Sequence, residues 1–299
     1  MSSKQTKLNP NKVLKVRTKL EKLLDRNRVI DGNNNSITHI SMNPCFPGKY
    51  SFDKSSRKKL NKLVKETNKL DINFSIGEKP QQYGPIKVDI DLEMPKDNQT
   101  GKLYDNDLVL QLIDMYRNAI NKYLDPQQSE LSCYVLEKEG TSAINSDLII
   151  KDGIHLFFPF LNCHFKVRHL IREFVVNQAK EQNIFDNYSK CAEDIIDKSI
   201  ISSNFWLMYG NSKPKSNPYK LTQVIAHDDS ELDLPETNEE LVDLFSLQSK
   251  HWKASNATTL NADFSEEDIN MECEMKGINN STTTQIDQLL PVNSEEEIR

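Results

Sequence analysis

Two carboxylates, Asp89 and Asp91, stand two positions apart in a segment where apolar and charged side chains alternate strictly from residue 86 to residue 94. This alternation predicts a half-buried strand, and the two-residue period of a strand places Asp89 and Asp91 on the same face. Mg²⁺ and Mn²⁺ prefer carboxylate oxygens and complete their coordination with substrate phosphates. The pair therefore predicts a metal-binding platform. A solvated acidic strand face and the Asp-x-Asp metal site of a glycosyltransferase are the alternatives.

A second group of candidate residues is Lys151, Gly153 and His155, at the entry to an apolar segment that continues to Phe160. A lysine and an imidazole on one strand face could bind a triphosphate, and a glycine between them permits close approach of its backbone. The alternative for His155 is a hydrogen-bonded core residue. This group predicts a nucleotide-binding edge.

A third group consists of Asp197 and, after an intervening loop, Lys213 in the segment 205–214. Asp197 could complete a metal site with the other two carboxylates, and Lys213 could offset phosphate charge. Read alone, Asp197 is also explained as a solvated residue at a helix end.

The elements that must position these residues alternate between strands and helices without a regular βαβ period, which favours an α+β fold over a doubly wound sheet. We expect a basic amphipathic helix near the start, strands over 37–42, 86–94, 133–137, 154–160, 205–209 and 219–226, and helices over 53–70, 106–123, 164–182 and 192–196.

Charge is distributed unevenly along the 299 residues, whose net charge is −6. Before residue 229 there are 34 basic and 27 acidic residues, whereas 229–299 holds 4 basic and 17 acidic residues. The sequence predicts three regions: a basic helix and loop over 1–35, a catalytic domain over 36–250, and an acidic linker or disordered tail over 251–299. The basic part could meet a polyanion, although a merely solubilising surface explains it equally well.

The five cysteines and the hydropathy pattern restrict the class of protein. The cysteine count is odd and no C-x-x-C pair occurs, which argues against a disulfide framework and a zinc site. No apolar run approaches the roughly 20 residues of a membrane span, and the Lys-rich start lacks a signal-peptide core. We expect an intracellular protein without a membrane partner.

Together, the three groups resemble the archaeo-eukaryotic primase superfamily, and within it the primase domain of the primase-helicases of large nucleocytoplasmic DNA viruses. Asp89-Ile90-Asp91 looks like the first motif, Gly153-Ile154-His155 like the second, and Asp197 like the third acidic position. Three further segments of the chain also resemble parts of the viral pattern. They are Thr38–Met42, Gly77–Pro80 and Trp206–Pro214 with Tyr219–Leu221.

The resemblance implies the fold and the chemistry. It implies an RRM-like palm sheet with an N-terminal α/β module, and two Mg²⁺ or Mn²⁺ ions held by Asp89, Asp91 and Asp197. The triphosphate of an NTP or dNTP would be bound by the second group and Lys213, and the protein would make primers on single-stranded DNA at a viral replication site in host cytoplasm or nucleus. A helicase domain or subunit is implied as a partner, since no Walker A sequence occurs in the chain.

Two features leave the function open. Many relatives have Ser where this chain has Gly153, so one hydroxyl contact to phosphate would be missing, and Lys151 could compensate.

A catalytically silent module that binds single strands remains an alternative function. The template could lie on a basic helix face, which a solvated face explains as well and whose residues are Arg57, Lys58, Lys59, Lys62 and Lys65.

Overall fold

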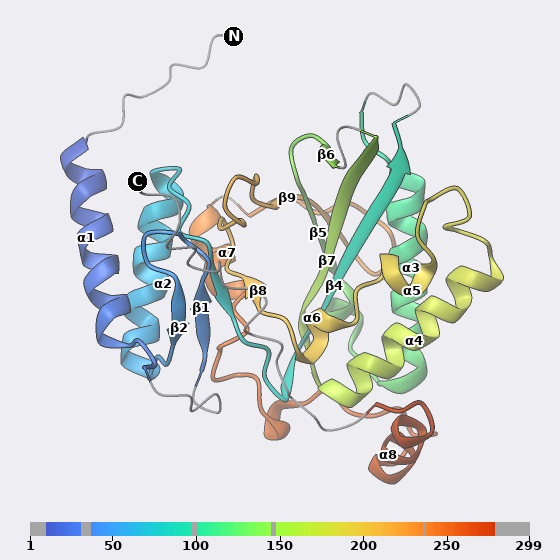
Figure 1. Ribbon diagram of the computed structural model, residues 1–299. Coiled ribbons are helices and arrows are strands. Elements are labelled where there is room, and N and C mark those ends of the chain that lie inside the picture. Colours follow the sequence, from blue (N-terminus) through green and yellow to red (C-terminus); the bar gives the residue numbers. More distant parts are fainter. Residues whose placement is uncertain (1–9, 31–36, 97–100, 145–147, 236, 279–299) are drawn as a thin grey trace.

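Two antiparallel sheets, each covered by helices on its outer side, form the molecule (Figure 1). The computed structural model describes residues 10–30, 37–96, 101–144, 148–235 and 237–278. The α+β class expected from the sequence is confirmed.

The first sheet is formed by short strands in the order β2-β1-β3-β8. Their bounds are β1 His39–Ser41, β2 Gly48–Tyr50, β3 Ile76–Glu78 and β8 Trp206–Leu207. Helices α1 (Pro10–Arg26) and α2 (Lys54–Lys69) pack against each other and bury their apolar faces over this sheet. Helix α2 begins after the N-cap residue Asp53, whose carboxylate accepts the Ser56 N–H at 2.7 Å.

The second sheet carries the candidate residues and has the order β4-β7-β5-β9, with β6 paired to β7. Its strands are β4 Tyr83–Pro95, β5 Cys133–Glu137, β6 Ser142–Ile144, β7 Ile149–His164 and β9 Lys220–Ile225. Helices α3 (Asn106–Tyr123) and α4 (Phe165–Glu181) contact each other and cover one face of this sheet (Figure 1). Both β4 and β7 are longer than the sequence predicts, since β4 begins three residues before the alternating segment 86–94 and β7 extends beyond the apolar segment 154–160 at both ends.

The chain order β4, α3, β5, β7, α4 follows the RRM-like pattern, and the segment after α4 returns to the free edge of β4. This segment contains α5 (Ala192–Ile195) and α6 (Ser199–Ser202). Ile196 forms an isolated bridge with Ile90 at that edge. The edge segment therefore occupies the place of a short additional strand, while β9 extends the sheet on its other side, next to β5.

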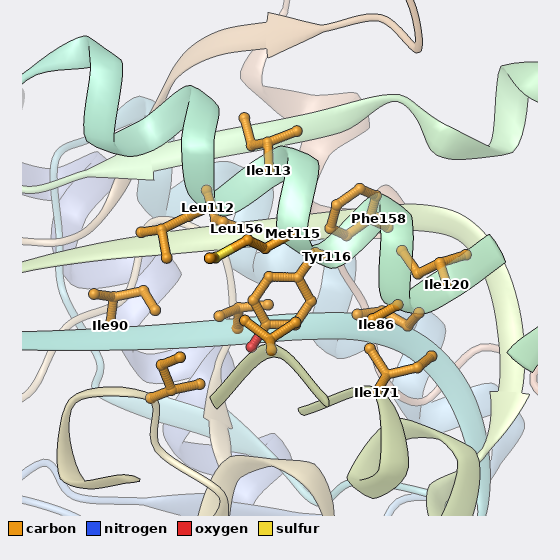
Figure 2. Close-up of a cluster of buried hydrophobic side chains, with 14 of the residues drawn as sticks. Ile86, Ile90, Leu112, Ile113, Met115, Tyr116, Ile120, Leu156, Phe158 and Ile171 are labelled. Carbon is orange, nitrogen blue, oxygen red and sulfur yellow. The ribbon is translucent and has the colours of Figure 1, made fainter. Parts of the chain in front are cut away.

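The alternating residues of β4 place their apolar members against α3 and α4, in the main core (Figure 2). Ile90 and Leu156 are fully buried there, together with Leu112 of α3. Each such side chain stabilises the folded state by roughly 1.5–3 kcal/mol. The opposite face of β4 is consequently left for its charged residues. No helix within the described ranges is long and apolar enough to cross a membrane.

Residues 251–278 differ from the expected acidic tail, because they fold back on the main core. They contain η3 (Ala254–Asn256) and α8 (Glu266–Met275), and Ile269 and Cys273 of α8 are buried against the core. Helix α8 begins with a capping box between Ser265 and Asp268. The periodicity of α8 is weak, which explains why the sequence does not reveal it; the rest of the expected tail, 279–299, lies outside the described residues.

A buried polar pair joins β1 and β3 in the first sheet. His39 and Glu78 face each other across these strands, with 3.5 Å between His39 Nε2 and Glu78 Oε1, and both side chains are almost fully buried. Glu78 also accepts the Ser246 hydroxyl at 2.8 Å and the Leu247 N–H at 2.6 Å, just after α7 (Asn238–Leu244). The first two viral-like segments thus meet in a structural contact away from the candidate residues.

Glu78→Ala is expected to lower the free energy of unfolding by about 3 kcal/mol, because it leaves His39, the Ser246 hydroxyl and the Leu247 N–H buried without their partner. Urea unfolding would measure the change, with Glu66→Ala on the surface of α2 as the control. An effect of Glu78→Ala no larger than that of Glu66→Ala would contradict this role.

Candidate active site

The charged face of β4 and β7 opens on a cavity of about 150 Å³ between the two sheets. Ile40 and Met42 line it from the side of the first sheet, and β4, β7 and the segment 197–219 line the rest. The predicted site residues that share this cavity are Asp89, Asp91, His155, Asp197 and Lys213.

Asp89 and Asp91 lie on the same face of β4, as the alternation predicts. The strand register pairs Asp89 with His155 and Asp91 with Gly153. Burial, followed by the neighbouring Asp89 carboxylate, raises the pKa of Asp91 to about 6, and Asp197 adds to the repulsion. The positive charges of Lys190 and Lys213 oppose this rise without cancelling it.

Asp89 differs from Asp91 because it faces an imidazole. Burial alone would raise the pKa of Asp89. His155, whose Nε2 lies 3.4 Å from Asp89 Oδ1, acts together with Lys213 and Lys138 in the opposite direction, and the pKa is lowered. The same Oδ1 is buried and accepts no hydrogen bond within the described residues. An orphan carboxylate oxygen beside a second carboxylate is a position where a cation would be favourable.

Asp197 reaches the cavity through the edge segment beside β4. Its N–H donates to the Asp89 carbonyl at 3.0 Å, which fixes the third acid next to the first. Its carboxylate accepts the N–H and the hydroxyl of Ser199, both at 2.7 Å, at the start of α6. The sequence therefore predicted the neighbourhood of Asp197, but not that its carboxylate is held by Ser199.

The residues present fit a divalent cation held by two carboxylates. Across the described part of the chain, no group of three or more His, Cys, Asp or Glu side chains converges closely enough to hold a metal ion by itself. Asp89 and Asp91 nevertheless supply the one or two carboxylates that Mg²⁺ uses when substrate phosphates complete its octahedron. As placed, Asp197 lines the cavity without closing a three-carboxylate cage.

His155 lies in a stack of aromatic rings that the sequence does not reveal. Tyr219 stacks on the imidazole with 3.4 Å between ring centroids, and Trp206 lies on it at 4.3 Å. Burial lowers the pKa of His155, although Asp89 opposes the shift. The imidazole is therefore fixed in orientation, with its Nε2 directed at Asp89.

Gly153 is required by the position of Tyr219. A Cβ atom on Gly153 would lie 2.4 Å from the Tyr219 hydroxyl oxygen and 3.2 Å from the Ile90 carbonyl oxygen, whereas the ring carbon Cζ would be at an ordinary 3.6 Å. The hydroxyl thus occupies the space of the side chain that Gly153 lacks.

Among the described residues, two lysines line the cavity, and the sequence predicted one of them. Lys213 was predicted; Lys138, just after β5, was not, because it lies in an ordinary charged turn of the sequence. Lys138 lies 4.3 Å above the Tyr219 ring and forms no salt bridge within the described residues. Burial lowers its pKa, while Asp89 and Asp91 oppose the shift. A partly desolvated lysine without an anionic partner is suited to bind phosphate.

Lys151 is not among the residues that line the cavity. Its ammonium pairs with Glu93, further along the charged face of β4, and Lys190 pairs with the same carboxylate at 2.7 Å. In this structure Lys151 does not compensate for Gly153, and the hydroxyl nearest to Gly153 belongs to Tyr219.

Two basic side chains attach the edge segment to the domain, and of these Lys87 is buried and His169 is half-buried. Lys87, on the charged face of β4, donates to the Ile200 carbonyl of α6 and is fully buried. His169 of α4 contacts Ser202 at the end of α6, with 3.2 Å between Nε2 and Oγ. Burial, assisted by Arg168 and Arg172, lowers the pKa of His169 to about 4.

Acidification is expected to weaken the fold through His169. Its pKa is about 4 in the folded chain and 6.5 in the reference state, so the unfolded chain binds more protons between these values. The free energy of unfolding should therefore decline as the pH falls from 6.5 towards 4, by about 1–2 kcal/mol at pH 5. Urea unfolding at pH 7 and pH 5 should show a smaller decline for His169→Gln, while exposed His227→Gln should leave it unchanged.

The predicted basic face of α2 is divided between two environments. Arg57 donates to the Gln248 carbonyl at 2.9 Å, and Lys65 pairs with Asp243 of α7. Lys58, Lys59 and Lys62 are exposed. All five lie on the outer side of the first sheet rather than in the cavity between the sheets (Figure 1).

Comparison with known proteins agrees with this geometry. The family described as the C962R protein N-terminal AEP domain, an archaeo-eukaryotic primase domain of viral primase-helicases, matches residues 38–225. The matched region contains both sheets and every residue of the cavity.

Several viral proteins are similar to the chain. "Putative helicase L207/L206" of Acanthamoeba polyphaga mimivirus is 29% identical over 192 residues, which are 63% of this chain and 20% of that protein. "Putative helicase 184R" of Invertebrate iridescent virus 6 is 29% identical over 180 residues, 54% of this chain and 18% of that protein. The chain thus spans about a fifth of the length of these relatives. Since the family model covers well over half of the chain, the chain belongs to the archaeo-eukaryotic primase domains of the C962R type.

Proposed function

We propose that this chain is the catalytic domain of a DNA primase or primase-polymerase, which joins nucleotides on a single-stranded DNA template. The observation that carries the proposal is the cavity in which β4, β7 and the edge segment bring together Asp89, Asp91, His155 and Asp197. Its position in the matched region of a primase-domain family supports the same function.

The protein residues would act by binding and orientation. Asp89 and Asp91 would hold Mg²⁺ or Mn²⁺, which when bound assists deprotonation of the attacking 3′-hydroxyl and neutralises the leaving pyrophosphate. Asp197 would keep the edge segment beside Asp89 and add negative charge for the cation. Lys138 and Lys213 would bind the triphosphate of an NTP or dNTP, a contribution of positioning and charge rather than covalent chemistry.

His155 would orient the substrate from its fixed place in the aromatic stack. Burial lowers its pKa, so the neutral imidazole is favoured, and a neutral ring can both donate and accept a hydrogen bond. The carboxylate of Asp89, facing Nε2, sets the direction of the ring.

The relatives suggest a partner for this reaction. They are viral proteins named as helicases, and the chain matches only a fifth of their length. We therefore propose that the domain works beside a helicase domain or subunit in a viral replication complex, where unwinding supplies the single-stranded template.

Primer synthesis on a single-stranded template tests the proposal. We expect labelled products with Mg²⁺ or Mn²⁺ from the native chain, and at least about 100-fold less from His155→Asn, which keeps much of the size but cannot reproduce both ring nitrogens. Binding of single strands without any incorporation by the native chain would overturn the catalytic assignment in favour of a silent binding module.

Lys138→Gln is expected to raise KM for the nucleotide about 10-fold while changing kcat less, because its charge would contact phosphate in both ground and transition states. The control is Lys220→Gln on β9, since Lys220 is exposed and does not line the cavity. Equal KM values for the Lys138→Gln and Lys220→Gln variants would remove Lys138 from the substrate site.

A further inference from the structure

The outer face of the N-terminal module is strongly basic. Helices α1 and α2 together carry 13 Lys and Arg residues and 3 Asp and Glu residues, whereas the whole chain has a net charge of −6. An excess of this size on two adjacent helices creates a positive surface that attracts polyanions.

A groove of about 340 Å³ runs between α1 and α2. Leu23 and Leu63 contribute apolar surface to it, and Glu66 is the one acidic lining residue in the described part of the chain. None of its basic lining residues forms a salt bridge with another described residue, and these residues are Lys19, Lys22, Arg26, Lys59 and Lys62. Their charges are therefore available to an external ligand.

A second groove, of about 530 Å³, lies on the other side of α2, against the segment that follows α7. Lys62 lines both grooves. Lys54, Lys58 and Lys250 add exposed positive charge to the second groove, where Asp243 is the acidic lining residue. Helix α2 is thus a basic ridge with a basic groove along each side.

The lining chemistry indicates which polyanion fits. Neither groove has an aromatic lining residue among those the structure describes. Sites for single strands usually offer aromatic rings on which the unpaired bases stack. The bases of a duplex are already stacked on one another, so contacts to its phosphates alone are sufficient.

We propose that α1 and α2 form a binding surface for the phosphate backbone of duplex nucleic acid, separate from the cavity between the sheets. The first sheet lies between this surface and β4 and β7 (Figure 1). Helix α1 precedes residue 38, where the match to the primase-domain family begins. This proposal rests on the proposed function in one respect: a domain that copies a template would form a duplex product, which the surface could bind.

The test is binding of a labelled DNA duplex to the full chain and to the quadruple variant Lys19→Gln, Lys22→Gln, Lys59→Gln and Lys62→Gln. Glutamine has a helix propensity similar to that of lysine, so the helices should persist. Each lost phosphate contact makes the slope of log affinity against log salt shallower by about 0.9, so we expect a change of about 3 to 4 and at least a 10-fold loss of affinity near 0.1 M salt.

A matched control removes four charges elsewhere, from exposed lysines of α3, α4, the η3 region and the end of α8, namely Lys122, Lys180, Lys253 and Lys276. This control variant should bind the duplex as the native chain does. An equal loss in both variants, or no loss in the groove variant, would overturn the proposal.

Two further measurements test which polyanion binds and whether binding is separate from catalysis. A single strand of the same sequence should bind the native chain more weakly than the duplex, and preferential binding of the single strand or of polyglutamate would overturn the assignment. Asp89→Asn with Asp91→Asn should bind duplex normally. Because this readout needs no nucleotide incorporation, the surface can stand if the catalytic proposal fails, and it can fail while catalysis stands.

Discussion

Replacing Asp89 and Asp91 together with Asn is expected to reduce nucleotide incorporation by at least about 10³-fold, equivalent to about 4 kcal/mol of transition-state stabilisation. The two carboxylates lie on one strand face, and burial together with Asp89 raises the pKa of Asp91 to about 6. Such repulsion between them is relieved by a divalent cation, and amide groups would remove both the charge and the stronger metal ligands.

Metal binding and stability separate this effect from misfolding. Titration with Mn²⁺ should show tighter binding to the native chain than to the double variant. Asp91→Asn should be at least as stable as the native chain at pH 7, because a carboxyl whose pKa is raised on folding destabilises the fold when it ionises. The control is Asp186→Asn with Asp263→Asn, at exposed positions. Undiminished incorporation by the Asp89 and Asp91 variant would refute the metal site.

Gly153→Ala is expected to impair nucleotide binding and to lower the free energy of unfolding by about 1–3 kcal/mol, because the new Cβ would lie 2.4 Å from the Tyr219 hydroxyl oxygen. Tyr219 would have to leave His155, on which it stacks with 3.4 Å between centroids. In the double variant Gly153→Ala with Tyr219→Phe, the clashing oxygen is absent, and the contacts that remain are 3.6 Å to the ring carbon and a tighter 3.2 Å to the Ile90 carbonyl oxygen. Most of the loss should therefore be recovered.

A double-mutant cycle measures this coupling. The stabilities and KM values of both single variants and the double variant would be compared, and Gly84→Ala serves as the control in the same strand pair, because its nearest contact would be an ordinary 3.4 Å from Arg168. Additive effects of Gly153→Ala and Tyr219→Phe would show that the hydroxyl does not determine the need for glycine.

The alternation in β4 could be read from the sequence because a strand's two-residue period is a local property. It predicted the shared face of Asp89 and Asp91 and the buried residues opposite them. The RRM-like fold came from the resemblance rather than from periodicity. The roles assigned to the acids remain predictions, since placement in one cavity does not measure metal binding.

The remaining features depend on contacts between distant segments. Lys138 and Tyr219 become neighbours of His155 only when β5, β7 and β9 pair, and neither residue type is distinctive by itself. Lys151 shares the strand face of His155, yet Glu93 holds it outside the cavity, a partner that spacing alone did not reveal. The short strands of the first sheet have too few residues to show a period.

The cavity joins the two halves of the molecule. Ile40 and Met42 belong to the N-terminal half, while Asp89 and His155 belong to the palm sheet, and the chain crosses from one sheet to the other between β8 and β9. A nucleotide bound there would contact residues of both sheets, which also share a cluster of buried apolar side chains that includes Phe157 and Trp206. Because a nucleotide would bind the folded chain and not the unfolded chain, its binding would raise the free energy of unfolding of the whole molecule.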